Sequence, residues 1–279
     1  MAGIYIHIPF CKKACHYCDF HFSTSLKLAE DLTTAICKEI ELRKHFFKTK
    51  IETVYFGGGT PSILPNQLLK KIFNSLQSHF DLTNVIEFTF EANPDDINQE
   101  KLSFLKDNGV NRISIGIQSF DKKNLEFLNR VHNEKEALTS IELTLQNKFE
   151  LSIDLIYGIH SSTLNSWQND LETFSQFPIN HLSSYCLTIE KDTVFGNWLD
   201  KKKIDEVKED KVIEQYNLLQ DFCEKENIEQ YEISNYAKDR KYAVHNSNYW
   251  KQKPYLGIGP SAHSYDIDKR YFNLSLIHI

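Results

Sequence analysis

Short runs rich in β-branched and aromatic residues alternate with amphipathic stretches from the first residues to about residue 235. The runs predict six strands, at Ile4–Ile8, Thr53–Phe56, Glu87–Glu91, Arg112–Gln118, Leu151–Ile156 and His181–Leu187. Strands that alternate with helices are typical of a parallel sheet with crossover helices. Such units either open into a doubly wound sheet or curl into a complete or partial barrel, and the periodicity alone fits both.

In two of the predicted helices, the apolar positions define a face that should be buried. Between Asp205 and Glu226, apolar residues recur every three or four positions. This spacing predicts one apolar face, made of Val212, Ile213, Tyr216, Leu219, Phe222 and Cys223. A second helix is predicted to begin near Pro65, because the fixed φ of proline suits a first helical turn. Its apolar positions are Leu68, Leu69, Ile72, Phe73 and Leu76.

After residue 235 the pattern becomes irregular and aromatic. Five large rings crowd into a short span, at Tyr236, Tyr242, Tyr249, Trp250 and Tyr255. No low-complexity linker separates the units that precede this span. We therefore expect an α/β domain over residues 1–235 and an aromatic-rich segment over residues 236–279.

Composition and charge narrow the class of protein. A chain of 279 residues with 41% hydrophobic and 25% charged residues can bury a large α/β core. A net charge of −6 gives no broad basic field, so nucleic acid is not an expected partner. The sequence has no apolar run of membrane-spanning length and no secretory signal pattern, so we expect no transmembrane segment and a cytoplasmic location.

Three of the six cysteines lie close together. Cys11, Cys15 and Cys18 directly follow the first predicted strand on one short polar loop, so their thiols can converge on one ligand. Thiolates are the ligands that iron–sulfur clusters and zinc prefer, and a [4Fe–4S] cube held by three cysteines leaves one iron open. Structural zinc is the main alternative, although it normally takes four protein ligands and no second cysteine pair exists here. The nearby histidines His7, His16 and His21 are the candidates for a fourth ligand.

The spacing Cys-x3-Cys-x2-Cys, with Tyr17 just before the third cysteine, closely resembles the signature of the radical S-adenosylmethionine (SAM) superfamily. The resemblance implies a partial (βα)6 TIM-like barrel. It also implies that SAM chelates the open iron through its amino and carboxylate groups, and that reduction of the cluster cleaves SAM to a 5′-deoxyadenosyl radical. A reductant for the cluster is therefore an expected partner.

Polar and glycine residues fall where the predicted strands end. A run of three glycines, Gly57 to Gly59, follows the second strand and allows a backbone to approach a ligand closely. Glu91 and Gln118 close the third and fourth strands, and Asp154 lies within the fifth. In parallel α/β barrels the carboxyl ends of the strands frame the active site, although each residue alone also fits a helix cap or a loop position.

Several longer stretches strengthen the resemblance. They begin at Tyr5, Phe56, Glu91, Ser114, Leu128 and Asp154, and together they resemble the oxygen-independent coproporphyrinogen III oxidase group across nearly the whole chain. The residues that this resemblance assigns to the SAM pocket are Tyr5, Tyr17, Gly58, Gly59, Thr60, Glu91, Gln118, Arg130 and Asp154.

The chain departs from the oxidase branch of this group at two places. Oxidases typically have a fourth cysteine two positions after the third, where this chain has Phe20, and they carry an extension ahead of the first strand. The stretch from His245 to Trp250 instead resembles the His-Asn-x-x-Tyr-Trp signature of the HemW-type heme chaperones. A histidine nitrogen can ligate heme iron, and the aromatic side chains of Tyr249 and Trp250 can pack on a flat macrocycle. From these six residues alone, a buried histidine in an aromatic cluster fits equally well.

We therefore interpret the chain as a heme-binding trafficking protein on a radical-enzyme scaffold, with His245 as the candidate axial heme ligand. Heme and a heme-accepting protein are the expected partners, and a homodimer is a further expectation. The first alternative is oxidative decarboxylation of coproporphyrinogen III to protoporphyrinogen IX, which would make the chain an enzyme. The second is a zinc-stabilised binding module. Because members of this group usually continue into a C-terminal domain, we expect this chain to be a piece of a longer protein.

Overall fold

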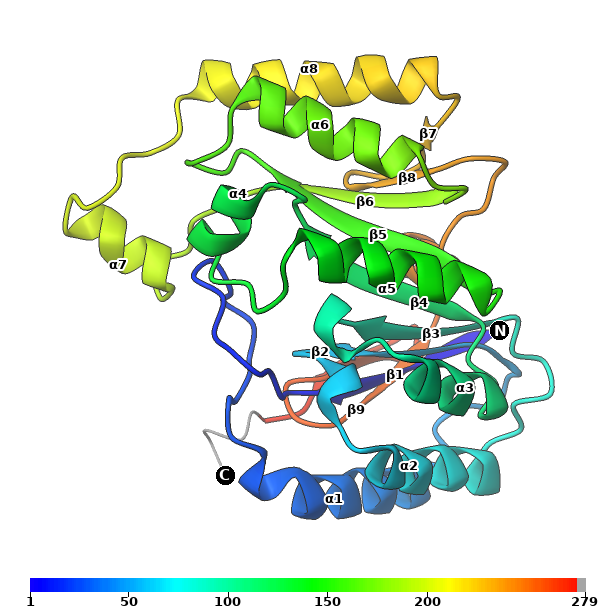
Figure 1. Cartoon of the computed structure of the whole chain (residues 1–279). Coiled ribbons are helices and arrows are strands. Elements are labelled where there is room, and N and C mark those ends of the chain that lie inside the picture. The colour runs from blue at the N-terminus through cyan, green and yellow to red at the C-terminus, as the bar shows by residue number, and fades with distance from the viewer. Residues whose placement is uncertain (275–279) are drawn as a thin grey trace.

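The computed structural model describes residues 1–274, which form one mixed sheet covered by helices (Figure 1). Six parallel strands in sequence order make up its centre: β1 (Ala2–Ile8), β2 (Ile51–Gly58), β3 (Glu87–Ala92), β4 (Arg112–Gln118), β5 (Glu150–Tyr157) and β6 (His181–Cys186). These strands confirm the six predicted runs. Within residues 1–274 the strand order runs from β11 to β7 without closing, so the structure is a partial barrel.

Helices connect and cover these strands. Up to residue 225 the α-helices are α1 (Ala29–Leu42), α2 (Asn66–His79), α3 (Gln99–Asp107), α4 (Lys122–Phe127), α5 (Glu134–Gln146), α6 (Leu164–Ser175), α7 (Val194–Asp200) and α8 (Glu209–Lys225). Short 3-10 turns lie at η1 (Leu26–Leu28), η2 (Pro61–Ile63) and η3 (Pro94–Asp96). None of the described helices is both long and apolar enough to cross a membrane.

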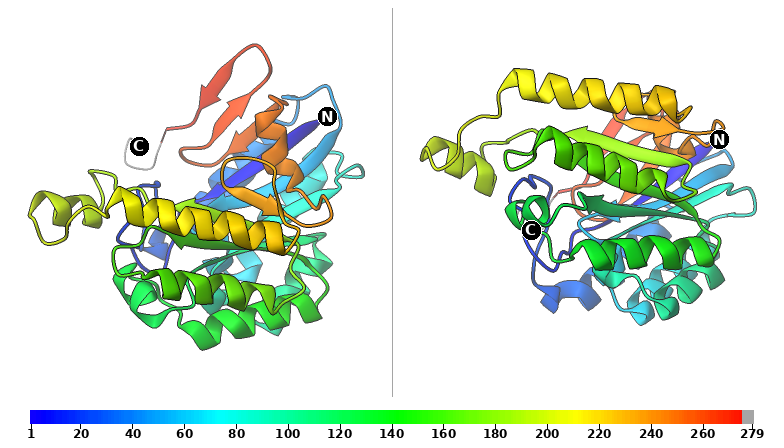
Figure 2. Two further views of the ribbon diagram at one scale, coloured as in Figure 1. Left: turned by 90° about the horizontal axis from the view of Figure 1, so that it is seen from above. Right: turned by 45° about the horizontal axis from the view of Figure 1, so that its top comes forward.

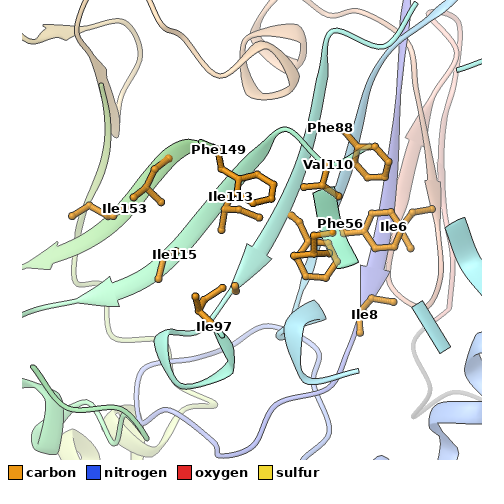
Figure 3. Close-up of a cluster of buried hydrophobic side chains, with 14 of the residues drawn as sticks. Ile6, Ile8, Phe56, Phe88, Ile97, Val110, Ile113, Ile115, Phe149 and Ile153 are labelled. Carbon is orange, nitrogen blue, oxygen red and sulfur yellow. The ribbon is translucent and has the colours of Figure 1, made fainter. Parts of the chain in front are cut away.

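The two faces of the parallel sheet differ in polarity because side chains alternate along each strand. Toward the helices, β4 places Ile113 and Ile115 in a continuous apolar core, which also takes Ile6, Phe56 and Ile153 from neighbouring strands (Figure 3). Toward the barrel interior, the same strands carry polar residues and glycines. Of the predicted site residues, Tyr5, Glu91, Gln118 and Asp154 lie on these strands and line the interior.

The predicted helix near Pro65 is confirmed. Pro65 is the N-cap of α2, and all five predicted apolar positions of that helix are buried. The predicted face of α8 is correct at Leu219 and Cys223 but wrong at Ile213 and Tyr216, which are 48% and 37% exposed. Gln215 is buried instead, because its side chain accepts a hydrogen bond from the amide of Gly158 and its carbonyl accepts one from Trp167. The buried face of α8 therefore includes Gln215 in place of two residues of the apolar stripe.

Residues 229–272 extend the sheet at both edges, although the chain after residue 235 is expected to be irregular. Beyond β6 the chain adds β7 (Glu229–Gln230) and β8 (Asn235–Ala237), and beyond β1 it adds β9 (Tyr255–Ile258), β10 (His263–Tyr265) and β11 (Arg270–Phe272). Strand β8 pairs antiparallel with β6, whereas β9 pairs parallel with β1. The helix between them, α9 (Val244–Trp250), lies on the side of the sheet opposite α5 and α6 (Figure 2). Residues 275–279 of the predicted segment lie outside the described residues.

Candidate functional site

The cysteine loop is held at the carboxyl end of the barrel by backbone contacts to three other segments. The amide of Cys11 donates to the carbonyl of Ser23, and the amide of His16 donates to Leu128 just after α4. The carbonyl of His16 in turn accepts from Phe195 at the start of α7. The loop therefore has a fixed position although it contains little regular structure.

Arg130 links the loop to the barrel wall. Its Nη1 lies 3.4 Å from the sulfur of Cys15, and its Nη2 donates to Asn93 Oδ1 at 2.6 Å and to the carbonyl of Gly116 at 2.7 Å. Asn93 also donates to the hydroxyl of Thr60, which lies 3.6 Å from the sulfur of Cys11. One chain of polar contacts thus connects two of the three cysteines to strands β2, β3 and β4.

Two glycines at the end of β2 are required by the packing. A Cβ on Gly59 would lie 2.8 Å from the carbonyl oxygen of Phe10 and 3.0 Å from the sulfur of Cys11. Gly58 has a φ of +114°, which side chains rarely adopt. The glycine run therefore brings β2 against the cysteine loop and does not merely form a turn.

A cavity of about 440 Å³ opens between the cysteine loop and the strand ends. It collects almost all of the predicted site residues, which are Cys11, Cys15, Tyr17, Cys18, Gly58, Gly59, Thr60, Glu91, Gln118, Arg130 and Asp154. These residues come from all parts of the first 154 positions of the chain. The structure therefore assembles one site from residues that the sequence placed far apart.

Two carboxyl groups lie on the inner wall of this cavity. Glu91 accepts from the hydroxyl of Tyr55 at 2.6 Å and from the amide of Gly58 at 3.2 Å, and burial raises its pKa to about 7. Asp154 accepts from the hydroxyl of Ser114 at 3.3 Å, and burial raises its pKa to about 6. The protein itself therefore offsets the negative charges of both carboxylates only in part, and a cationic group of a ligand would offset them further.

Tyr5 and His245 lie elsewhere, around an adjoining cavity of about 240 Å³ deeper in the barrel. Tyr5 contacts Nδ1 of His7 at 3.1 Å through its hydroxyl. His245 is only 2% exposed, with Nδ1 2.8 Å from the hydroxyl of Thr53 and Nε2 2.9 Å from the hydroxyl of Tyr249. Burial lowers the pKa of His245 to about 3, so the ring is neutral. Glu91 and Asp154 border both cavities.

Several cavity residues were missed by sequence reasoning. Asn93 positions both Arg130 and Thr60, and Ser114 holds Asp154, yet neither was singled out. Tyr185 on β6 borders both cavities. Ser114 and Tyr185 could have been found from the two-residue alternation of side chains along their strands, because it places both residues on the polar inward face. Asn93 gave no such signal, because it follows the end of β3.

The model of the "Radical SAM superfamily" matches residues 5–174 of the chain, which is more than half of its length. The "Heme chaperone HemW" of Bacillus subtilis (strain 168) is 37% identical over 269 residues, which cover 95% of this chain and 71% of that protein. The protein of the same name from Lactococcus lactis is 36% identical, over 98% of this chain and 72% of the relative.

A solved structure shares the fold at lower sequence identity. The coproporphyrinogen III oxidase HemN from Escherichia coli, described as a radical SAM enzyme, superposes with a TM-score of 0.86 at 22% identity. The superposition covers 99% of this chain and 67% of the oxidase. This likeness confirms the partial barrel of the radical SAM type.

Proposed function

Because the chain belongs to the radical SAM superfamily, and within it to the family of the HemW heme chaperones, we propose that it binds heme and transfers it to acceptor proteins. The observation that carries this proposal is the 37% identity over nearly the whole chain to a heme chaperone, while the structural likeness to the oxidase is at 22% identity. At the cysteine loop, Phe20 is 69% exposed at the rim of the cavity. The position where oxidases have a further cysteine thus carries no thiol.

We further propose that Cys11, Cys15 and Cys18 hold a [4Fe–4S] cluster. All three cysteines are free and partly exposed, and they border one cavity. Among residues 1–274, no three His, Cys, Asp or Glu side chains are close enough together to hold a single metal ion. A cube of iron and sulfide is larger than an ion and would reach thiols that are spread around the end of a cavity. Because the thiols must stay reduced to do so, we place the protein in the reducing cytoplasm.

We propose that SAM occupies the rest of the same cavity. The carboxylates of Glu91 and Asp154 can accept from its amino group or its ribose hydroxyls, and the backbone at Gly58 and Gly59 leaves room beside the cysteine loop. The chemistry that the reduced cluster supplies with SAM is cleavage to a carbon radical. In a heme carrier, the protein residues described here would bind and orient SAM whether or not that cleavage takes place.

His245 remains our candidate for the axial heme ligand, with Nε2 as the binding nitrogen. The ring is neutral, as iron ligation requires, but both nitrogens are hydrogen-bonded in the structure. Tyr249, the partner of Nε2, is 38% exposed and next to Trp250, which is 56% exposed. Movement of Tyr249 would therefore uncover Nε2 beside an exposed aromatic surface, whereas the partner of Nδ1, Thr53, lies inside the barrel.

The deciding experiment is anaerobic reconstitution of the cluster, followed by titration with hemin and, separately, incubation with coproporphyrinogen III and SAM under reducing conditions. We expect saturable, near-stoichiometric heme uptake and no protoporphyrinogen. Formation of protoporphyrinogen over many turnovers would establish the oxidase instead. A colourless protein without iron or labile sulfide would support the zinc-stabilised module. A homodimer, the reductant and the acceptor protein stay predictions.

A further inference from the structure

The deeper cavity of about 240 Å³ is lined by a buried cation, Arg112, one of whose donor atoms has no hydrogen-bond partner. Arg112, the first residue of β4, is only 6% exposed and its side chain borders the cavity. Its Nη2 atom is buried and has no hydrogen-bond partner, and Arg112 takes part in no ion pair of the described residues. A buried donor atom of a charged group is costly when it has no acceptor, so the Nη2 atom of Arg112 requires one.

The carboxylates nearest in the sheet are already engaged. Glu150 is the register neighbour of Arg112 on β5, but it pairs with Lys241 at 3.2 Å. Glu87, on the adjacent strand β3, accepts hydrogen bonds from the first two amides of α9. Asp154 borders the same cavity, but accepts from Ser114. Arg112 and Asp154 attract each other electrostatically, but among the described residues none of these three carboxylates accepts a hydrogen bond from the Nη2 atom of Arg112.

Two more unpaired polar atoms face the same space. The Nδ2 atom of Asn246 and the hydroxyl of Thr89 are buried without a partner, and both residues border the cavity. His181 next to them cannot act as an acceptor, because its two nitrogens already contact Ser152 and Tyr231 at 2.7 and 2.8 Å. Three buried polar atoms of the lining, on Arg112, Asn246 and Thr89, therefore have no hydrogen-bond partner.

We propose that Arg112, Asn246 and Thr89 form a buried binding site for a small monocarboxylate. The planar guanidinium matches a carboxylate in a two-pronged hydrogen bond, and its single charge balances a monoanion. The carboxylates of Glu91 and Asp154 on the upper wall of the cavity repel any anion, and they disfavour a doubly charged anion such as phosphate more strongly than a monoanion. The volume admits an acid of a few carbon atoms. This site lies below the SAM cavity and does not depend on the proposed heme function.

The test uses the full chain without cluster or heme, with acetate as the probe. Isothermal titration at constant ionic strength, with chloride as the balancing anion, should give saturable binding of one acetate to the wild type. The matched control Arg240→Gln removes the same charge at an exposed position and should bind equally well. Arg112→Gln should bind at least about tenfold more weakly, because a hydrogen bond to a charged group is lost.

Arg112→Lys keeps the charge but not the two-pronged geometry, so its affinity should lie between those of the wild type and Arg112→Gln. It also keeps the comparison possible if Arg112→Gln fails to fold. In that case saturation-transfer NMR of acetate on the wild type and Arg112→Lys replaces the titration. The absence of saturable acetate binding to the wild type would mean that only water fills the cavity and would overturn the proposal. Equal affinity in the wild type and the Arg112 variants would overturn it as well.

Discussion

The Nδ1 atom of His245 lies 2.8 Å from the hydroxyl oxygen of Thr53, which ties the candidate heme ligand on α9 to strand β2 inside the barrel. The Nε2 atom is held separately by Tyr249 at 2.9 Å. His245 therefore joins the C-terminal segment to the parallel sheet, and this structural role is independent of any ligation of heme iron. Any substitution of His245 changes this packing, so loss of heme binding alone cannot prove ligation.

Thr53→Val separates the two roles of His245. It removes the partner of Nδ1 while leaving Nε2 in place, and the free energy of unfolding should fall by about 1–3 kcal/mol because a buried nitrogen loses its hydrogen bond. If Nε2 binds iron, hemin affinity should stay near the wild-type value in Thr53→Val and be lost in His245→Ala. Hemin titration by absorption and thermal unfolding of both variants check this. Equal loss of heme binding in the two variants would show that His245 acts through the fold.

Each of the three loop cysteines should be necessary for the cluster. Replacement of Cys11, Cys15 or Cys18 by alanine should abolish bound iron and labile sulfide after anaerobic reconstitution, because two thiolates do not hold a [4Fe–4S] cube stably. Cys37 on α1 is a matched control, since it is also a free, partly buried thiol but lies outside the cavity. Iron and sulfide should be unchanged in Cys37→Ala. Full cluster content in any loop variant would remove that cysteine from the ligand set.

Glu91→Gln should weaken SAM binding by about tenfold or more, because a charge-assisted hydrogen bond is replaced by a neutral one. The amide would also turn its NH2 group toward either the hydroxyl of Tyr55 or the amide of Gly58, both of which donate to Glu91. The pKa of about 7 further predicts that wild-type affinity rises as the pH increases through 7, since only the ionised carboxylate attracts the amino group of SAM. Equilibrium dialysis with reconstituted protein between pH 6 and 8 measures both effects. A pH-independent affinity in the wild type would exclude Glu91 from this role.

The sequence predicted which residues come together at the site, but it did not predict how deeply each of them is buried. The order of strands and the two-residue alternation were sufficient to bring Glu91, Gln118 and Asp154 to one cavity, because parallel strands end at the same edge. His245 was predicted as a ligand from its motif, but its burial depends on the pairing of β9 with β1, which places α9 against the barrel. That pairing joins residues about 250 positions apart and has no local signal.

Charge and hydrogen bonding account for the other differences. The apolar stripe of α8 was misassigned because the buried Gln215 makes two specific hydrogen bonds that a periodicity argument does not include. Arg112 was predicted only as the first residue of a strand, and its role depends on which carboxylates pair elsewhere. Such pairings are set by the whole set of tertiary contacts.

Asp170 on α6 provides a test of stability against pH that is independent of cluster and heme. Its side chain is 1% exposed and accepts from the hydroxyl of Ser119 at 2.7 Å and from the amide of Phe120 at 2.6 Å. These bonds fix the chain directly after Gln118, which has a φ of +71°. Burial raises the pKa of Asp170 from 3.8 to about 7.

Because the folded protein holds this proton more tightly than the unfolded chain, the contribution of Asp170 to stability is fully present below pH 4 and is lost as the pH rises toward 7. The unfolding free energy of the wild type, relative to Asp170→Asn, should therefore fall by up to about 1.4 kcal/mol per pH unit across this range. Urea unfolding of both proteins at pH 4.5, 5.5, 6.5 and 7.5 gives the difference directly, and the exposed substitution Asp205→Asn is the control. The difference isolates Asp170 from Glu91 and Asp154, whose raised pKa values act in the same direction. A difference that rises with pH would mean that hydrogen bonds stabilise the carboxylate more than burial destabilises it.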